Sequence, residues 1–216
     1  MAETSKTRRK YTSIRRQNQA RQTRRLILEA ARRLFYQRGY PNTTIDAIAQ
    51  EAGVAPETVY ATFRAKQEIL KNLVDVTLVG DDEDTPLLQR PFIQETIKIT
   101  DPQAYIRSFA GDIYQIMTRM SPLFALLRST SDLDPEIAAL LKTILDERLK
   151  GMGFFLKHLV QLSPLREGVT PEQAQVTAWA LSSSEIFDLL TRVQGWSQEQ
   201  YIDWLSSSLS RLLLPD

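Results

Sequence analysis

Apolar residues recur every three or four positions through most of this sequence, and this spacing is what most limits the fold. The repeat runs from Leu26 to Phe35, and it returns between Asp101 and Met120. Such spacing places side chains on one face of an α-helix. Nowhere do apolar and polar residues alternate over a run long enough for a half-buried strand. We therefore predict an all-α fold.

Helix caps and breakers divide the first third of the chain into three helices. Gly39 ends the first helix, Thr44 is suited to N-cap the second, and Gly53 ends the second. Pro56 suits the first turn of the third helix, where a missing N–H costs nothing. The first helix is expected to bury one apolar face, made of Leu26, Ile27, Ala30, Ala31, Leu34 and Phe35.

The second and third helices have the spacing of a helix-turn-helix. Ala49, Ala52 and Gly53 are small enough to let the two helices approach closely. Val59 and Phe63, four residues apart, give the third helix a buried side and leave its other side open. In a helix-turn-helix that open side enters the major groove of DNA. The same spacing also fits an ordinary three-helix corner of an α-helical protein.

The distribution of charge favours the first alternative. Residues 1–72 carry 15 Lys and Arg against 6 Asp and Glu, whereas residues 73–216 carry 12 against 20. A basic first third beside an acidic remainder indicates a polyanionic partner for the first part alone. Residues 1–20 are polar and basic, so we expect a flexible arm there, or at most a frayed helix start. The plainer interpretation of this arm is a solvated tail.

The residues from Thr44 to Lys66 resemble the DNA-binding domain of the tetracycline-repressor (TetR) family. The segments TIDAIAQEAGV (44–54) and TVYATF (58–63), followed by Lys66, keep the family's pattern without a gap. The resemblance covers about residues 20–72. It implies a transcriptional regulator, most often a repressor, that binds a palindromic operator as a dimer and is released by a small effector.

The resemblance also implies which residues contact DNA. Thr44, Tyr60 and Lys66 hold phosphates, and the open side of the third helix faces the bases. Glu57 can accept a hydrogen bond from a cytosine amino group, and arginines of the arm add phosphate or minor-groove contacts. The base-facing residues are Pro56, Glu57, Thr58, Ala61 and Thr62.

Three positions depart from the family's pattern. Thr62 stands where His or Tyr is frequent, which puts one phosphate or base contact in doubt. Ala55 and Ala65 stand where the family often has a helix-capping side chain. Loss of such a cap costs about 1 kcal/mol, so both helix starts are expected to be weaker without a change of fold.

The remainder of the chain is also helical. Asp101-Pro102, Asp134-Pro135, Thr170-Pro171 and Ser197 each mark the start of a helix. We expect Ser121-Pro122 to interrupt the first of these helices. The chain thus divides into a basic arm at 1–20, a helix-turn-helix DNA-binding domain at 21–72, and a ligand-binding and dimerisation domain at 73–216.

Aromatic and methionine side chains are frequent in the second domain, and most of them suit plain core packing. A helical domain rich in adaptable side chains can also line an apolar pocket. The resemblance implies such a pocket, for an unknown small apolar effector. The residues expected to line it are Tyr105, Phe109, Met117, Phe124, Met152, Phe155 and Trp179.

The last two helices carry more apolar residues than one helix pair can bury. They are expected to run from Pro171 to about Val193 and from Ser197 to about Leu213. A two-fold, four-helix interface would use the surplus, and the family forms its dimers in this way. We therefore expect a homodimer.

Several classes of function are excluded by what the sequence lacks. It has no cysteine and one histidine, His158, so thiolate nucleophiles, iron–sulfur clusters and His-rich metal sites are excluded. No nucleotide-binding, hydrolase or metalloprotease motif occurs. The acidic run 81–84 is expected to be solvated rather than metal-binding. We expect no enzyme activity, no cofactor and no metal.

No apolar run reaches the length of a membrane span, and no apolar core follows the basic N-terminus as in a signal peptide. We therefore expect a cytoplasmic protein without a membrane partner. The second hypothesis is a helical small-molecule-binding or carrier protein whose basic N-terminus binds a membrane or RNA. Such a protein would need a basic amphipathic helix without a glycine turn and a second helix, which is not the pattern of residues 44–63.

Overall fold

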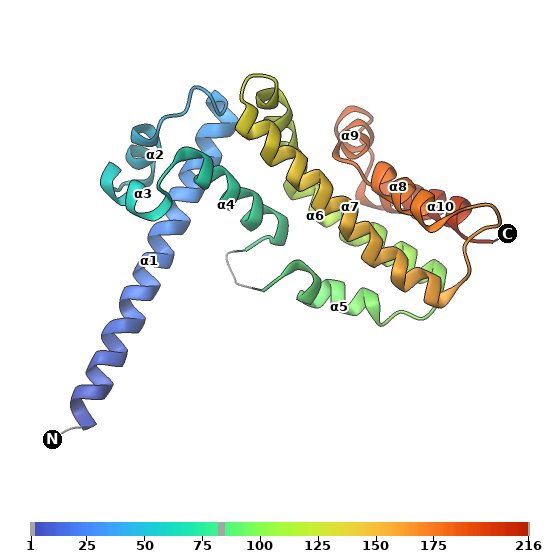
Figure 1. The fold of residues 1–216 in the computed structure, drawn as a ribbon, viewed down its shortest axis with the longest axis horizontal. Helices are drawn as coiled ribbons and strands as arrows, with labels where there is room; N and C mark the ends of the chain where they lie inside the picture. The colour runs from blue at the N-terminus through green and yellow to red at the C-terminus, as the bar shows by residue number, and fades with distance from the viewer. Residues whose placement is uncertain (1–2, 82–84, 216) are drawn as a thin grey trace. The chain divides into compact units, whose positions relative to one another are not determined.

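The computed structural model of the chain describes residues 3–81 and 85–215, and their regular structure is entirely helical (Figure 1). Side chains are described from Arg16 onward, except at Gln17. The chain forms two compact units, residues 1–75 and 76–216. Their division falls inside one helix, three residues beyond the predicted boundary at 72/73. Of the predicted acidic run, residues 82–84 lie outside the described residues.

The first unit is built on helix α1 (Glu3–Arg38), against which α2 (Ile45–Ala52) packs. Helix α3 (Pro56–Phe63) packs against α2, and α4 (Lys66–Val79) follows and continues past the unit boundary. The fully buried large side chains of this unit are Ile27, Phe35, Ile48, Val59, Phe63, Ile69 and Leu70.

One residue of the predicted apolar face of α1 is not buried. Leu26 is 42% exposed, and Leu28 is buried instead. At 100° per residue the buried positions centre between Ile27 and Ala31, and Leu26 lies beyond the edge of that stripe. The helix was correctly predicted, but the limits of its buried face were not.

Helix α1 begins at Glu3, where the sequence predicted an arm as far as residue 20. No glycine or proline occurs between residues 3 and 38. Arginine, lysine and glutamine are frequent there, and all three favour the helical state. The first helix-breaking residue is Gly39, whose φ of +78° ends α1. The absence of an apolar face therefore did not prevent a helix.

The second unit is centred on the long helix α6 (Pro102–Ser131). Helix α7 (Pro135–Leu162) runs beside it, and α5 (Pro91–Ile97) and α10 (Gln198–Leu213) also pack against it (Figure 1). Helix α8 (Pro171–Leu181) packs against α7 and α10. The shorter elements of this unit are η1 (Leu87–Gln89), α9 (Ser184–Asp188) and η2 (Leu189–Val193).

The prediction that Ser121-Pro122 interrupts the first long helix was wrong. Helix α6 continues through Pro122 to Ser131. An internal proline removes one backbone hydrogen bond and costs about 3 kcal/mol. Burial of a large apolar side chain is worth about 1.5–3 kcal/mol, and the apolar stripe continues on both sides of the proline. Its nearly fully buried members include Met117, Met120, Leu123, Phe124 and Leu127.

The predicted helix from Pro171 to Val193 is instead broken at a run of serines. Helix α8 ends at Leu181, and the Ser183 hydroxyl accepts a hydrogen bond from the Ile186 N–H (3.4 Å) to begin α9. Serine hydroxyls compete with the helical backbone for hydrogen bonds, which makes such a break favourable. The helix at Ser197 begins as predicted, with a capping box. Among the described residues, no helix is long and apolar enough to cross a bilayer.

Candidate functional site

The turn between α2 and α3 has the geometry that a helix-turn-helix requires. Gly53 adopts φ +67° and ψ +33°, a left-handed conformation that side chains other than glycine rarely adopt. The N–H of Val54 then donates to the carbonyl of Ala49 (3.0 Å). Pro56 starts α3 as predicted, and Ala55 supplies no side-chain cap. The sequence therefore predicted this turn correctly from local signals.

Helix α3 has one buried side and one open side. Val59 and Phe63 are fully buried, while Tyr60 is 51% exposed, and Glu57 and Ala61 are exposed as well. These three open-side residues belong to the predicted DNA contacts. Their exposure leaves them accessible to the base edges in a DNA groove.

The remaining predicted contacts of α3 are half-buried. Pro56, Thr58 and Thr62 all lie at the margin of its open face. The Thr62 hydroxyl donates to the Thr58 carbonyl at 2.7 Å, so this hydroxyl has no further hydrogen to give and can only accept. Thr62 therefore suits an amino group or a water molecule better than a phosphate.

The N-terminus of α2 is suited to bind an anion. Thr44 is exposed, and its Oγ1 accepts a hydrogen bond from the Ala47 N–H (3.1 Å). Because that bond uses a lone pair, the hydroxyl hydrogen of Thr44 is left to donate outward. The first N–H groups of a helix and its dipole also favour a negative charge there.

Lys66 has a different environment from the one that the resemblance implies. Its ammonium donates to the carbonyls of Tyr40 (2.8 Å) and Thr43 (2.9 Å), and it lies 4.2 Å from the centre of the Tyr40 ring. Tyr40 and Thr43 are both buried. Lys66 therefore fastens the loop between α1 and α2 to the start of α4. No sequence signal indicates this role, because the acceptors are backbone carbonyls 26 and 23 residues away.

Arg24 and Arg33 also hold helices of the first unit together, and the sequence did not predict this role. The guanidinium of Arg24 lies over the Phe63 ring, 5.0 Å from its centre, and donates to Asn72. Arg33 pairs with Glu51 at 2.9 Å and ties α1 to α2 at the surface. Among the arginines of α1 whose side chains the structure describes, those that remain exposed and add positive charge to the unit are Arg16, Arg21, Arg25, Arg32, Arg33 and Arg38.

In the second unit, three of the predicted effector residues come together. The rings of Phe109 and Phe155 stack with their centres 3.8 Å apart, and Tyr105 stacks on Phe155 at 5.4 Å. The Tyr105 hydroxyl donates to the Phe155 carbonyl (3.2 Å) and its ring contacts His158. Met117, Phe124 and Met152 are buried, and none of the described aromatic pairs of this cluster includes them.

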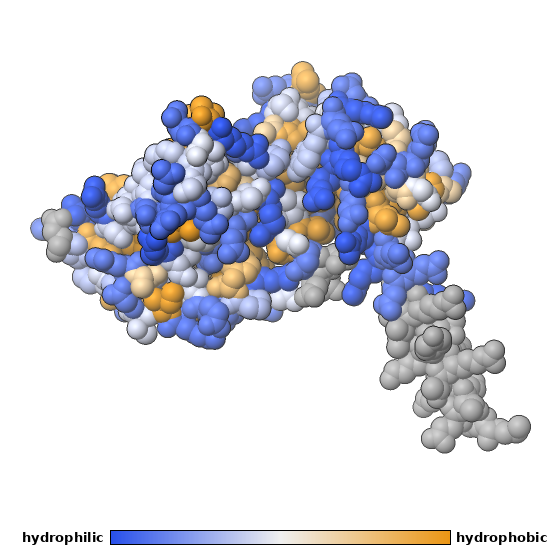
Figure 2. All heavy atoms as spheres, turned by 180° about the vertical axis from the view of Figure 1, so that it is seen from behind, coloured by the Kyte–Doolittle hydropathy of each residue, from blue (hydrophilic) through white to orange (hydrophobic). Residues whose placement is uncertain are grey.

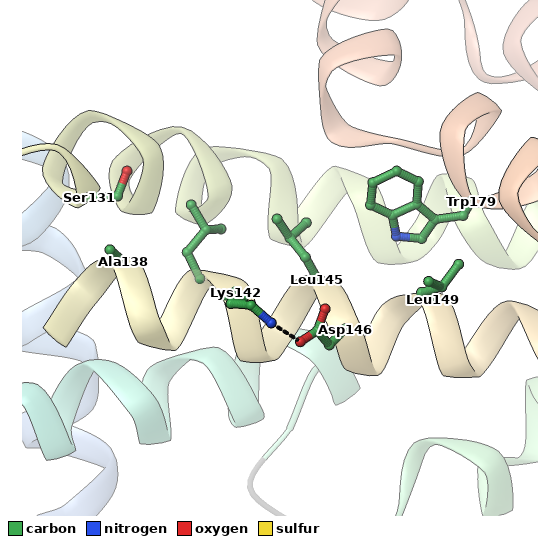
Figure 3. Close-up of a pocket in the computed structure, with 8 residues that line it drawn as sticks. Ser131, Ala138, Lys142, Leu145, Asp146, Leu149 and Trp179 are labelled. Atoms are coloured by element: carbon green, nitrogen blue, oxygen red, sulfur yellow. Dashed lines mark hydrogen bonds and ion pairs between the residues drawn. The ribbon is translucent and has the colours of Figure 1, made fainter. Parts of the chain in front are cut away.

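Trp179, the seventh predicted effector residue, lines a separate groove of about 420 Å³ (Figure 3). The groove follows one face of α7, and the Lys142–Asp146 ion pair (2.8 Å) lies on it. Arg148 lies 5.5 Å from the Trp179 ring centre and donates to the Trp179 carbonyl. The groove-lining residues are Ser131, Ala138, Leu141, Lys142, Leu145, Asp146, Leu149 and Trp179.

A buried acid next to the aromatic cluster was not predicted. Asp112 is 7% exposed, and its Oδ2 accepts a hydrogen bond from the Thr96 hydroxyl (2.7 Å). Burial raises the pKa of Asp112 to about 6, although the hydrogen bond from Thr96 opposes the shift. A helical pattern places Asp112 on the same face as Tyr105 and Phe109, and that register was the signal that could have found it.

The predicted apolar surplus of the last helix is largely used within the chain. Tyr201, Leu205, Leu209 and Leu213 are all fully buried, because α10 packs against α6. Figure 2 shows apolar residues as separate orange patches within a mostly hydrophilic surface. The apolar residues of the C-terminal segment that stay exposed are Val176, Leu189, Val193 and Leu212.

Comparison with known proteins assigns the first unit. Residues 27–73 match the family described as "Bacterial regulatory proteins, tetR family". The chain carries a TetR-family DNA-binding domain. Over 57 residues it is 44% identical to "HTH-type transcriptional regulator TtgR" of Pseudomonas putida. That alignment covers 26% of this chain and 27% of TtgR, so the sequence likeness spans about a quarter of either protein.

Solved structures extend the likeness in fold to both units of the chain. NalD of Pseudomonas aeruginosa, described as the secondary repressor of the MexAB-OprM multidrug efflux pump, is 20% identical with a TM-score of 0.67. The match covers 91% of this chain and 97% of NalD. FadR of Bacillus subtilis, solved with stearoyl-CoA, is 17% identical with a TM-score of 0.67, over 85% and 96%. The TetR-type fold thus extends through the C-terminal helices.

Proposed function

We propose that this protein is a ligand-responsive transcriptional regulator, acting as a repressor, that binds a palindromic operator as a homodimer. The observation that carries the proposal is the open side of α3, where Glu57, Tyr60 and Ala61 are exposed above the buried Val59 and Phe63. This face belongs to a unit with a large excess of arginine and lysine. A membrane or RNA carrier would not need a second helix held at a glycine turn.

The contacts to DNA divide into positioning and recognition. Thr44, with the N-terminus of α2, and the Tyr60 hydroxyl bind phosphates and set the register of the protein on the duplex. Glu57 accepts a hydrogen bond from a cytosine amino group, and Ala61 packs against a thymine methyl. Lys66 supports this surface through the loop at Tyr40 rather than by a contact of its own.

The exposed apolar side chains of the C-terminal segment support a dimer. Val193 is 69% exposed and Leu189 is 54% exposed, and both lie on η2, beyond the serine break. Val176 on α8 and Leu212 on α10 are also exposed. A two-fold axis through these residues would bury the same apolar patch from both subunits. Two α3 helices, one from each subunit, would then read two half-sites about one DNA turn apart.

Release by an effector requires that the second unit act on α4. The guanidinium of Arg119 on α6 donates to the carbonyls of Thr77 (3.2 Å) and Leu78 (3.1 Å), the last turn of α4. A ligand that shifts α6 therefore shifts the end of the helix that begins at Lys66 in the DNA-binding unit. The fold neighbour FadR binds stearoyl-CoA, which supports a small effector for this chain as well.

Selection of a duplex from a random library, followed by a salt titration of its affinity, tests the proposal. With about 6–10 phosphate contacts, affinity is expected to fall roughly 10³–10⁵-fold between 50 and 200 mM salt. Tyr60→Phe should weaken binding and leave the melting temperature unchanged, since the Tyr60 side chain is half exposed. Glu199→Gln, on the first turn of α10, serves as the control. A selected duplex whose binding hardly responds to salt would contradict the proposal.

A further inference from the structure

Asp112 lies on α6 in a buried, hydrogen-bonded position where α5 packs against that helix. The Thr96 hydroxyl of α5 donates to its Oδ2 at 2.7 Å, and Ser108 lies 2.8 Å from the Thr96 hydroxyl. The Thr96 hydroxyl also lies 3.2 Å from the Phe92 carbonyl oxygen. A hydroxyl has one hydrogen to give, so when Thr96 donates to Asp112, Ser108 is the donor to Thr96. The carboxylate then accepts one hydroxyl hydrogen bond, and these hydroxyls supply no positive charge.

The charge of Asp112 is not balanced by a basic residue. Within the described part of the chain, Asp112 forms no ion pair, and Thr96 is its charge-stabilising hydrogen-bond partner. Burial is the main cause that raises its pKa to about 6, so the carboxylate is still mostly ionised at pH 7.5. An ionised carboxylate without a cation is unfavourable in a protein interior. A bound cation would remove that penalty.

The surroundings of Asp112 suit an organic cation better than a metal ion. Tyr105, Phe109 and Asp112 follow one another at intervals of four and three residues, so they share one face of α6. Phe155 of α7 stacks on both rings of that face. Aromatic faces carry negative charge density and attract ammonium groups. Metal ions prefer several oxygen, nitrogen or sulfur ligands, and no such group of acidic or histidine side chains occurs among the described residues.

We propose that Asp112, with the rings of Tyr105, Phe109 and Phe155, forms the polar end of an effector site for organic cations that carry an apolar body. The inference rests on the proposed function, because it names the chemical class of the effector. The cationic group pairs with the Asp112 carboxylate and lies against the aromatic rings. The apolar body parts the Phe109–Phe155 stack and replaces its contacts.

Benzyltrimethylammonium and its uncharged carbon isostere, neopentylbenzene, form the pair of probes that tests this inference. The two molecules have nearly the same shape and differ in one charge. Ligand-observed NMR at pH 7.5 on the full chain is expected to show a dissociation constant at least tenfold lower for the cation than for the isostere. Equal affinity of the two probes, or binding of neither, would overturn the inference.

Asp112→Asn keeps the size and the acceptor oxygen of the side chain and removes its charge. This variant is expected to bind the cation at least tenfold more weakly and the isostere unchanged. The matched control is Asp132→Asn, which removes an exposed carboxylate from the end of α6 and should bind the cation like the unaltered protein. If both variants bind the cation equally well, Asp112 is not its partner.

The pH dependence in the unaltered protein gives a test that needs no variant to fold. Cation affinity should rise between pH 5 and pH 7.5, because Asp112 must lose its proton to bind. The groups facing the site are the Thr96 and Ser108 hydroxyls, the Tyr105 phenol and the His158 imidazole; Glu95 and Lys98 of α5 pair with each other in solvent. His158→Gln removes the imidazole that contacts Tyr105, and the rise in cation affinity must persist in that variant.

Operator binding separates failure of this inference from failure of the proposed function. Affinity for the selected duplex is measured without a probe and then with benzyltrimethylammonium at saturating concentration. A tenfold weakening by the cation, absent with neopentylbenzene, is expected. Steep, specific operator binding combined with no cation binding would overturn the inference and leave the proposed function standing. Failure of operator binding alone would overturn the function and leave a cation-binding protein.

Discussion

Replacement of Lys66 by methionine tests whether this residue holds DNA or holds the domain together. Methionine keeps the apolar stem and removes the ammonium. The change removes the hydrogen bonds to the carbonyls of Tyr40 and Thr43 and the contact with the Tyr40 ring. Both acceptor residues are buried, so their carbonyls lose partners that water does not readily replace.

The expected loss of stability follows from these contacts. A hydrogen bond to a charged group is worth about 1.5–3 kcal/mol, and two such bonds on a half-buried side chain amount to about 2–4 kcal/mol after allowance for solvent. That is a large share of a typical free energy of unfolding of about 5–15 kcal/mol. Urea denaturation followed by circular dichroism measures it. Lys71→Met, on the exposed side of α4, should change the free energy of unfolding by less than about 0.5 kcal/mol.

The salt dependence of DNA binding distinguishes the two roles of Lys66. A lysine that neutralises one phosphate changes the slope of log K against log salt by about 0.9 when it is removed. At a temperature where Lys66→Met remains folded, we expect an unchanged slope. A variant with full stability and a slope reduced by about one would refute the structural role and restore the phosphate contact that the family resemblance implies.

Two further predictions concern the second unit. The double variant Leu189→Lys, Val193→Lys should give folded monomers in sedimentation velocity, because both side chains are exposed. Leu205→Lys should instead unfold the unit, because Leu205 is fully buried. A folded dimer of the double variant would contradict the proposed interface. Burial raises the pKa of Asp112 to about 6 in the folded state, against about 3.9 in the unfolded chain. The folded state therefore binds this proton more tightly, so the stability gained from it at low pH is lost as the pH rises from about 4 to 6. Most of that loss, about 2–3 kcal/mol, falls between pH 4 and pH 7.5 and should be absent in Asp112→Asn. Urea titrations at these two pH values in which the stabilities of the two proteins differ equally would refute it.

The local part of the fold could be predicted from the sequence, because caps and breakers act within a few residues. Thr44, Gly53 and Pro56 set the ends of α2 and α3 where they were expected. Such signals also marked the starts of α7 at Asp134 and of α10 at Ser197. These residues fix a helix end through their own backbone or side chain, so no knowledge of the tertiary structure is needed.

Features that depend on packing were predicted poorly. Pro122 was expected to end a helix, but the buried residues around it keep α6 continuous. The buried leucines of α10 were assigned to a dimer because a sequence does not show that α10 packs on α6. Leu26 was misplaced for the same reason, since the width of a buried stripe depends on its neighbours.

Within the candidate sites, the open side of α3 was predictable and the supporting residues were not. Glu57, Tyr60 and Ala61 follow from the helical period and the family pattern. Lys66 bonds to backbone carbonyls, which have no sequence signature. Asp112 shares a helix face with Tyr105 and Phe109, but its burial also depends on Thr96 and the covering helix α5, which the sequence does not place.

Selection of the preferred DNA sequence with an altered α3 tests the central claim most directly. Glu57→Gln changes one exposed side chain on the open face of α3 from an acceptor to both a donor and an acceptor, and leaves the buried side intact. Our account predicts that the unaltered protein selects two inverted half-sites about one DNA turn apart. It also predicts that Glu57→Gln selects a different base at one position in each half-site, with unchanged stability. Identical selected sequences for both proteins, or no enrichment for either, would contradict the claim that α3 reads DNA.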